Sequence, residues 1–279
     1  MIDETYAWQW LRDAARSHGG HSADAGSTRL TVDNAGRWQT EEALTDAARA
    51  MLDALVPVAC SGATFVIGQL GQSLDGRIAT ASGHSHYVTG YASRVHLHRL
   101  RALVDAVVVG AGTVAADDPQ LTVRHVEGDN PVRVVLDPRG RLGADRRLFS
   151  DPAAPTLHLT ATGRAQDRHA HVRHVALAST PGQSVPAASI VARLAERGLR
   201  RVLVEGGGAT VSRFVDDGVL DRLHVVVAPM LIGSGRPALS LPEIDTLERA
   251  LRPACQSAAM GEDRLFDLAL DRAHASGNG

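Results

Sequence analysis

The sequence has few cysteines, no excess of basic charge and no long hydrophobic run. Its two cysteines, Cys60 and Cys255, form no Cys-x-x-Cys pair, so we expect both to be buried apolar residues in a reduced compartment. A formal net charge of −2 without a basic stripe argues against nucleic acid or a membrane surface as a partner. No apolar run approaches the roughly 18 residues of a membrane span, and the acidic start at Asp3 and Glu4 is unlike a signal peptide. These absences predict a cytoplasmic protein that binds neither nucleic acid nor membrane.

The composition is ordinary for a globular protein, and the pattern of the chain changes near residue 60. With 44% hydrophobic residues over 279 positions, the chain suits one sizeable domain with an appendage. Residues 1–60 predict helices at Tyr6–Ser17 and Glu41–Leu55, the second capped by Thr40. We therefore expect a helical N-terminal extension over residues 1–60, followed by a domain over residues 61–279. The extension also holds all three tryptophans, which we expect in a core or a dimer contact: Trp8, Trp10 and Trp38.

From residue 63 onward, strand patterns alternate with helical patterns. Strands are predicted at Thr64–Leu70, Ala106–Val109, Val132–Leu136, Thr156–Thr160, Arg201–Val204, Leu223–Val227 and Leu265–Leu270. Helices are predicted at Tyr91–Leu103, Ala187–Arg197 and Thr210–Asp217. This alternation predicts an α/β fold with a largely parallel sheet, because parallel neighbours need crossover connections. Ligands on such sheets lie beyond the carboxyl ends of the strands, which would place Gly110–Thr113, Asp137–Arg139 and Glu205–Ala209 along one rim.

The segment Ala106–Pro119 is the most informative stretch of the chain. A short apolar strand leads into Gly110-Ala111-Gly112, where the backbone can closely approach a ligand. The pattern matches the Gly-x-Gly-x-x-Ala dinucleotide fingerprint, but Pro119 follows too soon for the full helix that this fingerprint needs. We therefore expect a glycine turn followed by a short acidic segment, Asp117 and Asp118. Ligand binding and a plain tight turn both fit this spacing.

A second glycine segment, Val204–Ala209, is better suited to a phosphate group. Three consecutive glycines follow Glu205 after a predicted strand and lead directly into a predicted helix. Unobstructed backbone N–H groups and the positive end of the helix dipole favour an anion there. A purely structural turn is the alternative, although three glycines in a row make it costly in chain entropy. By contrast, Asp75-Gly76 is by itself an ordinary turn signal.

The histidines do not have the spacing of a metal site. None pairs with cysteines at zinc-site spacing, so surface positions or polar networks are expected for the grouped histidines: His84 and His86, His96 and His98, and His169, His171 and His174. His125-Val126-Glu127 spells the His-x-Glu of zinc deaminases, but no Pro-Cys-x-x-Cys accompanies it. We therefore predict no metal.

Taken in order, the motifs of the chain resemble one family. They are Gln69–Ala79, Arg101 within a helix, Val109–Val114, Asp117–Arg124, Pro131–Asp137, Glu205–Gly208 and Ala228–Gly233. Together they resemble the reductase domain of riboflavin biosynthesis, the RibD/RibG C-terminal family, which also occurs as stand-alone pyrimidine reductases. The resemblance covers about residues 63–270 and leaves residues 1–60 outside it.

The resemblance implies a dihydrofolate-reductase-like α/β fold, usually dimeric, with a mostly parallel central sheet flanked by helices. It implies NADPH-dependent reduction of a phosphoribosylamino-pyrimidine to the ribitylamino compound, with hydride going to the sugar C1. By position, the residues that would face the substrate are Ser85, Arg101, Leu121, Arg124 and Glu205, of which Glu205 is the candidate catalytic residue. Those that would face NADPH are Gly71, Tyr87, Thr113, Asp117, Pro138, Gly207, Gly208, Ala209, Thr210, Val211, Ser212 and Arg213.

The residue types suit this chemistry. Guanidinium groups such as those of Arg101 and Arg124 bind a sugar phosphate bidentately. A carboxylate such as Glu205 can orient ribose hydroxyls or assist proton transfer. The turn Pro138-Arg139-Gly140-Arg141 offers cations for the 2′-phosphate of NADPH.

The chain departs from the family pattern in three ways. Gln69 stands where bacterial bifunctional members typically carry Lys, Tyr87 stands where they usually carry Trp, and the zinc deaminase half is missing. The substrate is therefore open between the uracil, the diamino-pyrimidinone and a related compound of a side pathway. A non-catalytic nucleotide-binding subunit, with the extension binding a partner, is the alternative to an enzyme.

Overall fold

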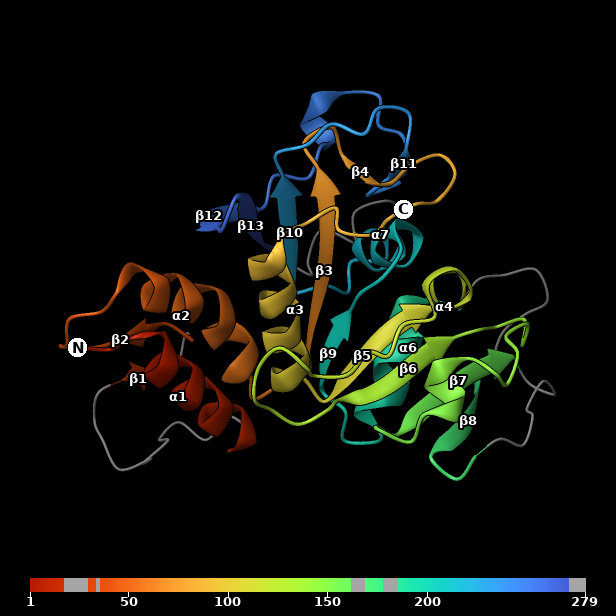
Figure 1. Cartoon of the computed structure of the whole chain (residues 1–279), viewed down its shortest axis with the longest axis horizontal. Helices are drawn as coiled ribbons and strands as arrows, with labels where there is room; N and C mark the ends of the chain where they lie inside the picture. Colours follow the sequence, from red (N-terminus) through yellow and green to blue (C-terminus); the bar gives the residue numbers. More distant parts are fainter. Residues whose placement is uncertain (18–29, 34–35, 162–168, 178–184, 271–279) are drawn as a thin grey trace.

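A nine-stranded sheet organises the molecule, with strand order β12-β13-β10-β3-β9-β5-β6-β7-β8. The computed structural model describes residues 1–17, 30–33, 36–161, 169–177 and 185–270. The strands of this sheet are β3 (Phe65–Ser73), β5 (Ala106–Gly110), β6 (Val132–Leu136), β7 (Thr156–Ala161), β8 (Val172–Leu177), β9 (Arg201–Val204), β10 (Arg222–Ala228), β12 (Ala254–Met260) and β13 (Asp263–Ala269). Every neighbouring pair from β10 to β8 is parallel, whereas β13 at one edge is antiparallel to both of its neighbours, β10 and β12. The predicted α/β fold with a mostly parallel sheet is confirmed (Figure 1).

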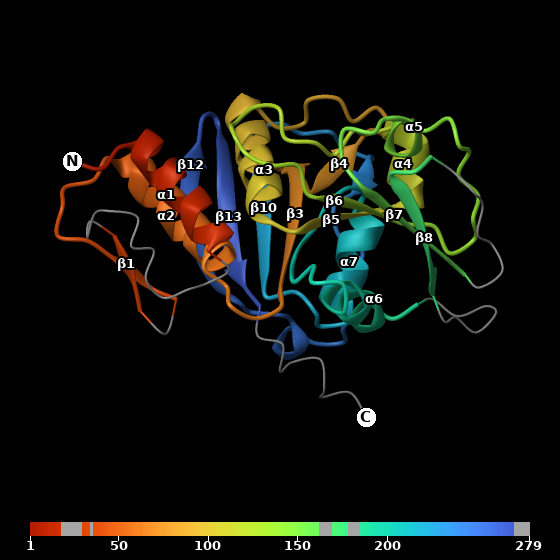
Figure 2. The ribbon, with the colours of Figure 1, turned by 90° about the horizontal axis from the view of Figure 1, so that it is seen from below.

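Helices cover both faces of the sheet. One face carries α1 (Glu4–Arg16), α2 (Asp46–Ala59) and α3 (Tyr91–Leu103), and the other carries α6 (Ala187–Ala195) and α7 (Gly208–Asp216) (Figure 2). Two hydrophobic clusters fill the space between helices and sheet, one on each side. The smaller elements are β1 (Thr31–Val32), β2 (Trp38–Gln39), β4 (Arg77–Ala79), α4 (Ala111–Asp117), α5 (Arg147–Ser150), β11 (Arg236–Pro237) and the 3-10 turn η1 (Leu247–Arg249).

The N-terminal extension packs directly on the sheet. Its buried side chains, Trp8 and Trp10 among them, belong to the same hydrophobic cluster as Ile67 of β3 and Leu100 of α3. Arg99 of α3 adds an ion pair to Glu4 (3.5 Å) and lies over the Trp8 ring. The expected core packing of these two tryptophans is confirmed.

The second helix of the extension begins later than predicted. Its cap is Thr45, whose hydroxyl accepts a hydrogen bond from the Ala48 N–H (3.1 Å), and α2 runs from Asp46 to Ala59. The predicted cap, Thr40, is wrong because its hydroxyl accepts from the Glu42 N–H in a local turn. Pairing of the following segment with Ile2 holds that segment in an extended conformation.

Two further predictions need correction. A helix of seven residues, α4, follows Gly110 where a glycine turn was expected; it ends at Asp117, and Asp118 (φ 39°) takes the left-handed conformation before Pro119. Cys255 is exposed on the edge strand β12 rather than buried. Cys60 is half-buried, and burial raises the pKa of its thiol to about 11 despite the nearby Arg201.

Two strands of the nine-stranded sheet, β8 and β12, were not predicted because their residues lack a continuous apolar pattern. The short strands β1, β2, β4 and β11 outside this sheet were not predicted either. In β8 polar side chains interrupt the apolar ones, and β12 is a largely exposed edge of small and polar residues. The remaining predicted strands and helices appear with shifts of a few residues at their ends. Within the described residues, no helix is both long and apolar enough to cross a membrane.

Candidate active site

The glycine segments after β5 and β9 meet at the carboxyl edge of the sheet. The Gly207 N–H donates to the Thr113 hydroxyl (2.7 Å), which joins the start of α7 to α4. Gly110 pairs with Leu136 at the ends of β5 and β6, so Asp137 follows at the same edge. The predicted rim of three loops is confirmed.

Glycine is required at Gly206 by both backbone and space. Its φ is +103°, and a Cβ there would lie 3.0 Å from both the Val109 side chain and the Thr113 hydroxyl. Gly207 is the N-cap of α7 and supplies no side-chain cap. The first turn of α7 therefore ends in backbone N–H groups without a side-chain cap, the arrangement at which anions bind to helices.

Arg101 and Glu205 form a buried, two-pronged ion pair beside this loop. Arg101 comes from the last turn of α3, and its Nε and Nη2 donate to the two oxygens of Glu205 at 2.8 and 2.7 Å. Its Nη1 donates to the Thr122 carbonyl at 3.0 Å. Both charged side chains are buried. The structure thus brings the two predicted residues together as one unit in which each neutralises the other.

Arg124 is the exposed cation next to this pair. Its Nη1 donates to the Thr122 hydroxyl (2.7 Å), so Thr122 links the two arginines. Partial burial and the charge of Arg101 both lower the pKa of the Arg124 guanidinium, as expected for neighbouring cations. Of the two arginines, Arg124 is the one with its charge accessible to a ligand.

His98 fixes the backbone of Arg124. Its Nδ1 accepts a hydrogen bond from the Arg124 N–H at 2.8 Å. Burial, with the charges of Arg101 and Arg124, lowers the pKa of His98 to about 3. The imidazole therefore remains neutral near pH 7, as an accepting Nδ1 requires.

The other predicted residues divide into accessible and buried ones. Ser85 is half-buried, Tyr87 is exposed with φ +64° and with Arg94 over its ring, and Asp117 is exposed at the end of α4. Pro138 is partly buried after β6, and a Cβ on Gly71 would meet Thr89.

Several predicted contacts are not available through side chains. Leu121 and Val211 are buried in the two hydrophobic clusters, and the Ser212 hydroxyl accepts from the Ser240 N–H (2.8 Å) inside the molecule. Gly208 packs against the carbonyl of Ala238. On α7 the accessible predicted positions are Gly207, Ala209, Thr210 and the partly buried Arg213.

Sequence reasoning did not single out Thr122 and did not give His98 its role. Thr122 lies two residues before Arg124 in the Asp117–Arg124 motif, and His98 lies one helical turn before Arg101. Their spacing from the two arginines could therefore have identified both residues as parts of the site. The sequence identified Gln69 only as a departure from the family pattern. It is buried on β3, one residue after Gly68, which pairs with Val204 at the end of β9, and Glu205 follows Val204.

A buried histidine pair lies on the same face of the sheet. His96 Nε2 and His224 Nδ1 are 2.9 Å apart, and His224 Nε2 lies 3.2 Å from Asp267. The predicted polar-network role is confirmed for His96. Among the described residues, no group of three or more His, Cys, Asp or Glu could hold a metal ion.

Known proteins are similar to this chain in sequence and in fold. The RibD C-terminal domain matches residues 64–263. The chain is 36% identical over 211 residues to the 2,5-diamino-6-ribosylamino-4(3H)-pyrimidinone 5′-phosphate reductase of Methanothermobacter thermautotrophicus, covering 73% of this chain and 96% of that protein. It is 33% identical to the riboflavin biosynthesis protein RibD of Aquifex aeolicus, covering 69% of this chain and 54% of that one.

A solved structure supports the same relationship. The diaminohydroxyphosphoribosylaminopyrimidine deaminase/5-amino-6-(5-phosphoribosylamino)uracil reductase of Thermotoga maritima superposes with a TM-score of 0.66 at 29% identity. The superposition covers 80% of this chain and 61% of that one. The chain therefore spans nearly all of the archaeal reductase and a little over half of the RibD proteins.

Proposed function

The chain belongs to the RibD C-terminal domain family, and from this we propose that it is an NADPH-dependent reductase of riboflavin biosynthesis. The substrate is a phosphoribosylamino-pyrimidine, and the product is its ribitylamino counterpart. The archaeal relative is named for a diamino-pyrimidinone phosphate, and the bacterial one for 5-amino-6-(5-phosphoribosylamino)uracil. Both remain candidates for this chain.

The Arg101–Glu205 pair with Arg124 beside it carries the proposal. A ribose phosphate needs an accessible cation, which Arg124 supplies, and the hydroxyls of the sugar need a fixed acceptor, which Glu205 supplies. Because Arg101 holds both oxygens of Glu205, the carboxylate is fixed before a substrate arrives. Hydride adds to C1 of the open sugar and a proton to the adjacent nitrogen, so the C=N bond becomes a C–N single bond.

The glycine loop fits a dinucleotide phosphate. The Gly206 backbone leaves no room for a side chain, and nothing lies within 4 Å of where a Cβ on Gly112 would be. The residues that would hold the cofactor are Gly207, Ala209 and Thr210, with the exposed Arg139 and Arg141 for a 2′-phosphate. When bound, the reduced nicotinamide supplies the hydride.

We further assign the active form to a cytoplasmic homodimer. Large apolar side chains are exposed, including Leu231 (75%) and Leu247 (73%), and a second copy of the chain would cover such surface. Light scattering at micromolar concentration tests this. A mass near twice 29.5 kDa is expected, and a mass of 29.5 kDa would contradict the dimer.

Activity is tested by following the absorbance of the reduced cofactor with each of the two pyrimidine phosphates. We expect turnover with at least one, tighter binding of NADPH than of NADH by calorimetry, and no effect of a chelator. The matched variant Glu205→Gln keeps the shape and removes the charge, so kcat should fall while NADPH affinity persists. Absence of turnover with both pyrimidines, in protein that binds NADPH, would favour the non-catalytic alternative. Equal affinities for the two cofactors would contradict the preference for NADPH.

A further inference from the structure

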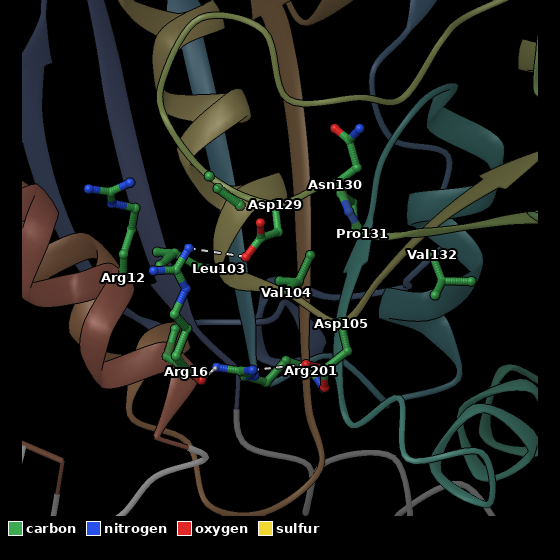
Figure 3. Close-up of a pocket in the computed structure, with 13 residues that line it drawn as sticks. Arg12, Arg16, Leu103, Val104, Asp105, Asp129, Asn130, Pro131, Val132 and Arg201 are labelled. Atoms are coloured by element: carbon green, nitrogen blue, oxygen red, sulfur yellow. Dashed lines mark hydrogen bonds and ion pairs between the residues drawn. The ribbon is translucent and has the colours of Figure 1, made fainter. Parts of the chain in front are cut away.

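A cavity of about 270 Å³ lies between α1 of the extension and the domain (Figure 3). Its charged lining residues are Arg12, Arg16, Asp105, Asp129 and Arg201. Its domain side is formed where β5, β6 and β9 begin, whereas the candidate active site lies where these strands end. Three of its residues come from α1, outside the part of the chain that matches the family. The proposed reductase activity therefore does not account for this cavity.

Arg201 lies at the floor of the cavity, where its charge is paired with that of Asp105. It is 8% exposed, and its Nη2 donates to Asp105 (2.8 Å) while its Nη1 donates to the Ala15 carbonyl (2.7 Å). Asp105 also accepts the N–H groups of Arg200 and Arg201. This pair is held from several sides and stays in place whatever occupies the cavity.

Arg12 and Arg16 differ from Arg201 because each contacts a highly exposed carboxylate. They stand one turn apart on α1, so both reach the same side of the helix. Arg12 contacts Glu127 (3.1 Å) and Arg16 contacts Asp129 (3.2 Å), and these carboxylates are 83% and 85% exposed. Ion pairs to exposed carboxylates are weak, so an anion that binds arginine more strongly can replace them. The Arg12 Nε is also buried without a hydrogen-bond partner in the described residues.

We propose that this cavity binds a small phosphomonoester of about the size of a pentose phosphate. Two guanidinium groups on successive turns can share the oxygens of one dianion, which forms stronger hydrogen bonds with arginine than an exposed carboxylate does. The walls beyond them, from Leu103, Val104, Pro131 and Val132, can contact the C–H groups of a pentose. A volume of about 270 Å³ is small for a ligand pocket, which suits a pentose phosphate better than a dinucleotide.

The test is titration calorimetry of the full chain with ribose 5-phosphate, inorganic phosphate and ribose. The measurement is made in the Arg124→Ala background, which weakens phosphate binding at the candidate active site. We expect ribose 5-phosphate to bind more tightly than inorganic phosphate, and ribose not to bind. Arg12→Gln with Arg16→Gln should weaken ribose 5-phosphate binding at least tenfold. Arg37→Gln, which removes an exposed ion pair with Asp33 elsewhere in the extension, is the control and should leave binding unchanged.

A second pair of variants tests the proposal without touching the arginines. Glu127→Gln with Asp129→Asn removes the competing carboxylates from exposed positions, so ribose 5-phosphate should bind more tightly. A purely structural role for these ion pairs predicts no such gain. The proposal is wrong if ribose 5-phosphate fails to bind in the Arg124→Ala background, if it binds no more tightly than inorganic phosphate, or if the Glu127 and Asp129 variants leave its affinity unchanged. It is also wrong if the folded Arg12 and Arg16 variant binds as well as the control.

Discussion

Arg101 and Arg124 are both arginines near one site, yet their surroundings give them different tasks. Arg101 is enclosed, and within the described part of the chain its side chain donates to Glu205 and to the Thr122 carbonyl. Arg124 is exposed, and among the described residues its guanidinium donates to the Thr122 hydroxyl. At the scale of single residues, burial therefore separates a residue that positions Glu205 from one that meets the substrate.

Alanine at each arginine should expose this difference. Arg101→Ala leaves the Glu205 carboxylate buried without its partner, which should lower the free energy of unfolding by about 3–5 kcal/mol. Arg124→Ala should change it by less than about 1 kcal/mol but raise the KM for the phosphorylated substrate roughly ten- to hundredfold. Denaturant unfolding and steady-state kinetics measure both effects, with Arg193→Ala on α6 as the exposed control. Loss of NADPH binding in Arg124→Ala with an unchanged substrate KM would show that the residue serves the other ligand.

At the scale of elements, the glycine loop between β9 and α7 is the part that the sequence predicted best. Consecutive glycines between a strand and a helix have few structural uses, so the sequence alone predicts a loop at this position. The Arg101–Glu205 pair was different. Both residues were proposed for the site, but they are separated by 104 positions, and only the fold shows that their charges satisfy each other.

The missed strands have a comparable physical reason. The edge strand β12 is largely exposed, so its sequence needs no apolar alternation. In β8 the polar Arg173 and His174 separate the buried apolar residues, and pairing with β7 decides its conformation. The helix α4 was not predicted because Pro119 was taken to exclude any helix directly after Gly112. A proline allows a helix that ends two residues before it.

Alanine at Gly206 tests the glycine loop as an element. Its positive φ and the 3.0 Å approach to Val109 and Thr113 should make Gly206→Ala weaken NADPH binding and lower stability by roughly 1–3 kcal/mol. Gly36→Ala is a matched control, because Gly36 also has a positive φ but nothing lies within 4 Å of its Cβ position. Calorimetric titration with NADPH should distinguish the two variants. Equal NADPH affinities would mean that the loop does not hold the cofactor.

At the scale of the whole molecule, the buried histidines of α3 couple folding to pH. Burial lowers the pKa of His98 from 6.5 to about 3, and it lowers the pKa of His96 as well. Below pH 6.5 the unfolded chain therefore binds protons that the folded protein does not, so stability falls as the pH decreases from 6.5 towards 3.

The change His98→Asn keeps an acceptor near the Nδ1 position and removes the titrating group. Between pH 6 and 4, the unfolding free energy of this variant should vary less steeply than that of the wild type, by up to about 1.4 kcal/mol per pH unit. Urea unfolding at several pH values measures the slope. His84→Asn, at an exposed position, should leave it unchanged. Identical slopes for His98→Asn and the wild type would contradict the assignment.

Because the extension and the domain share one hydrophobic cluster, we expect them to unfold together. Ile2, Leu11 and Leu52 are fully buried in the same cluster as Ile67 and Leu203, so neither part can melt without exposing the interior of the other. Residues 1–60 lie outside the part of the sequence that matches the family, but their packing makes them part of the same cooperative folding unit as the sheet. Heating should produce one calorimetric transition. Limited proteolysis should not release residues 61–279 as a stable folded fragment.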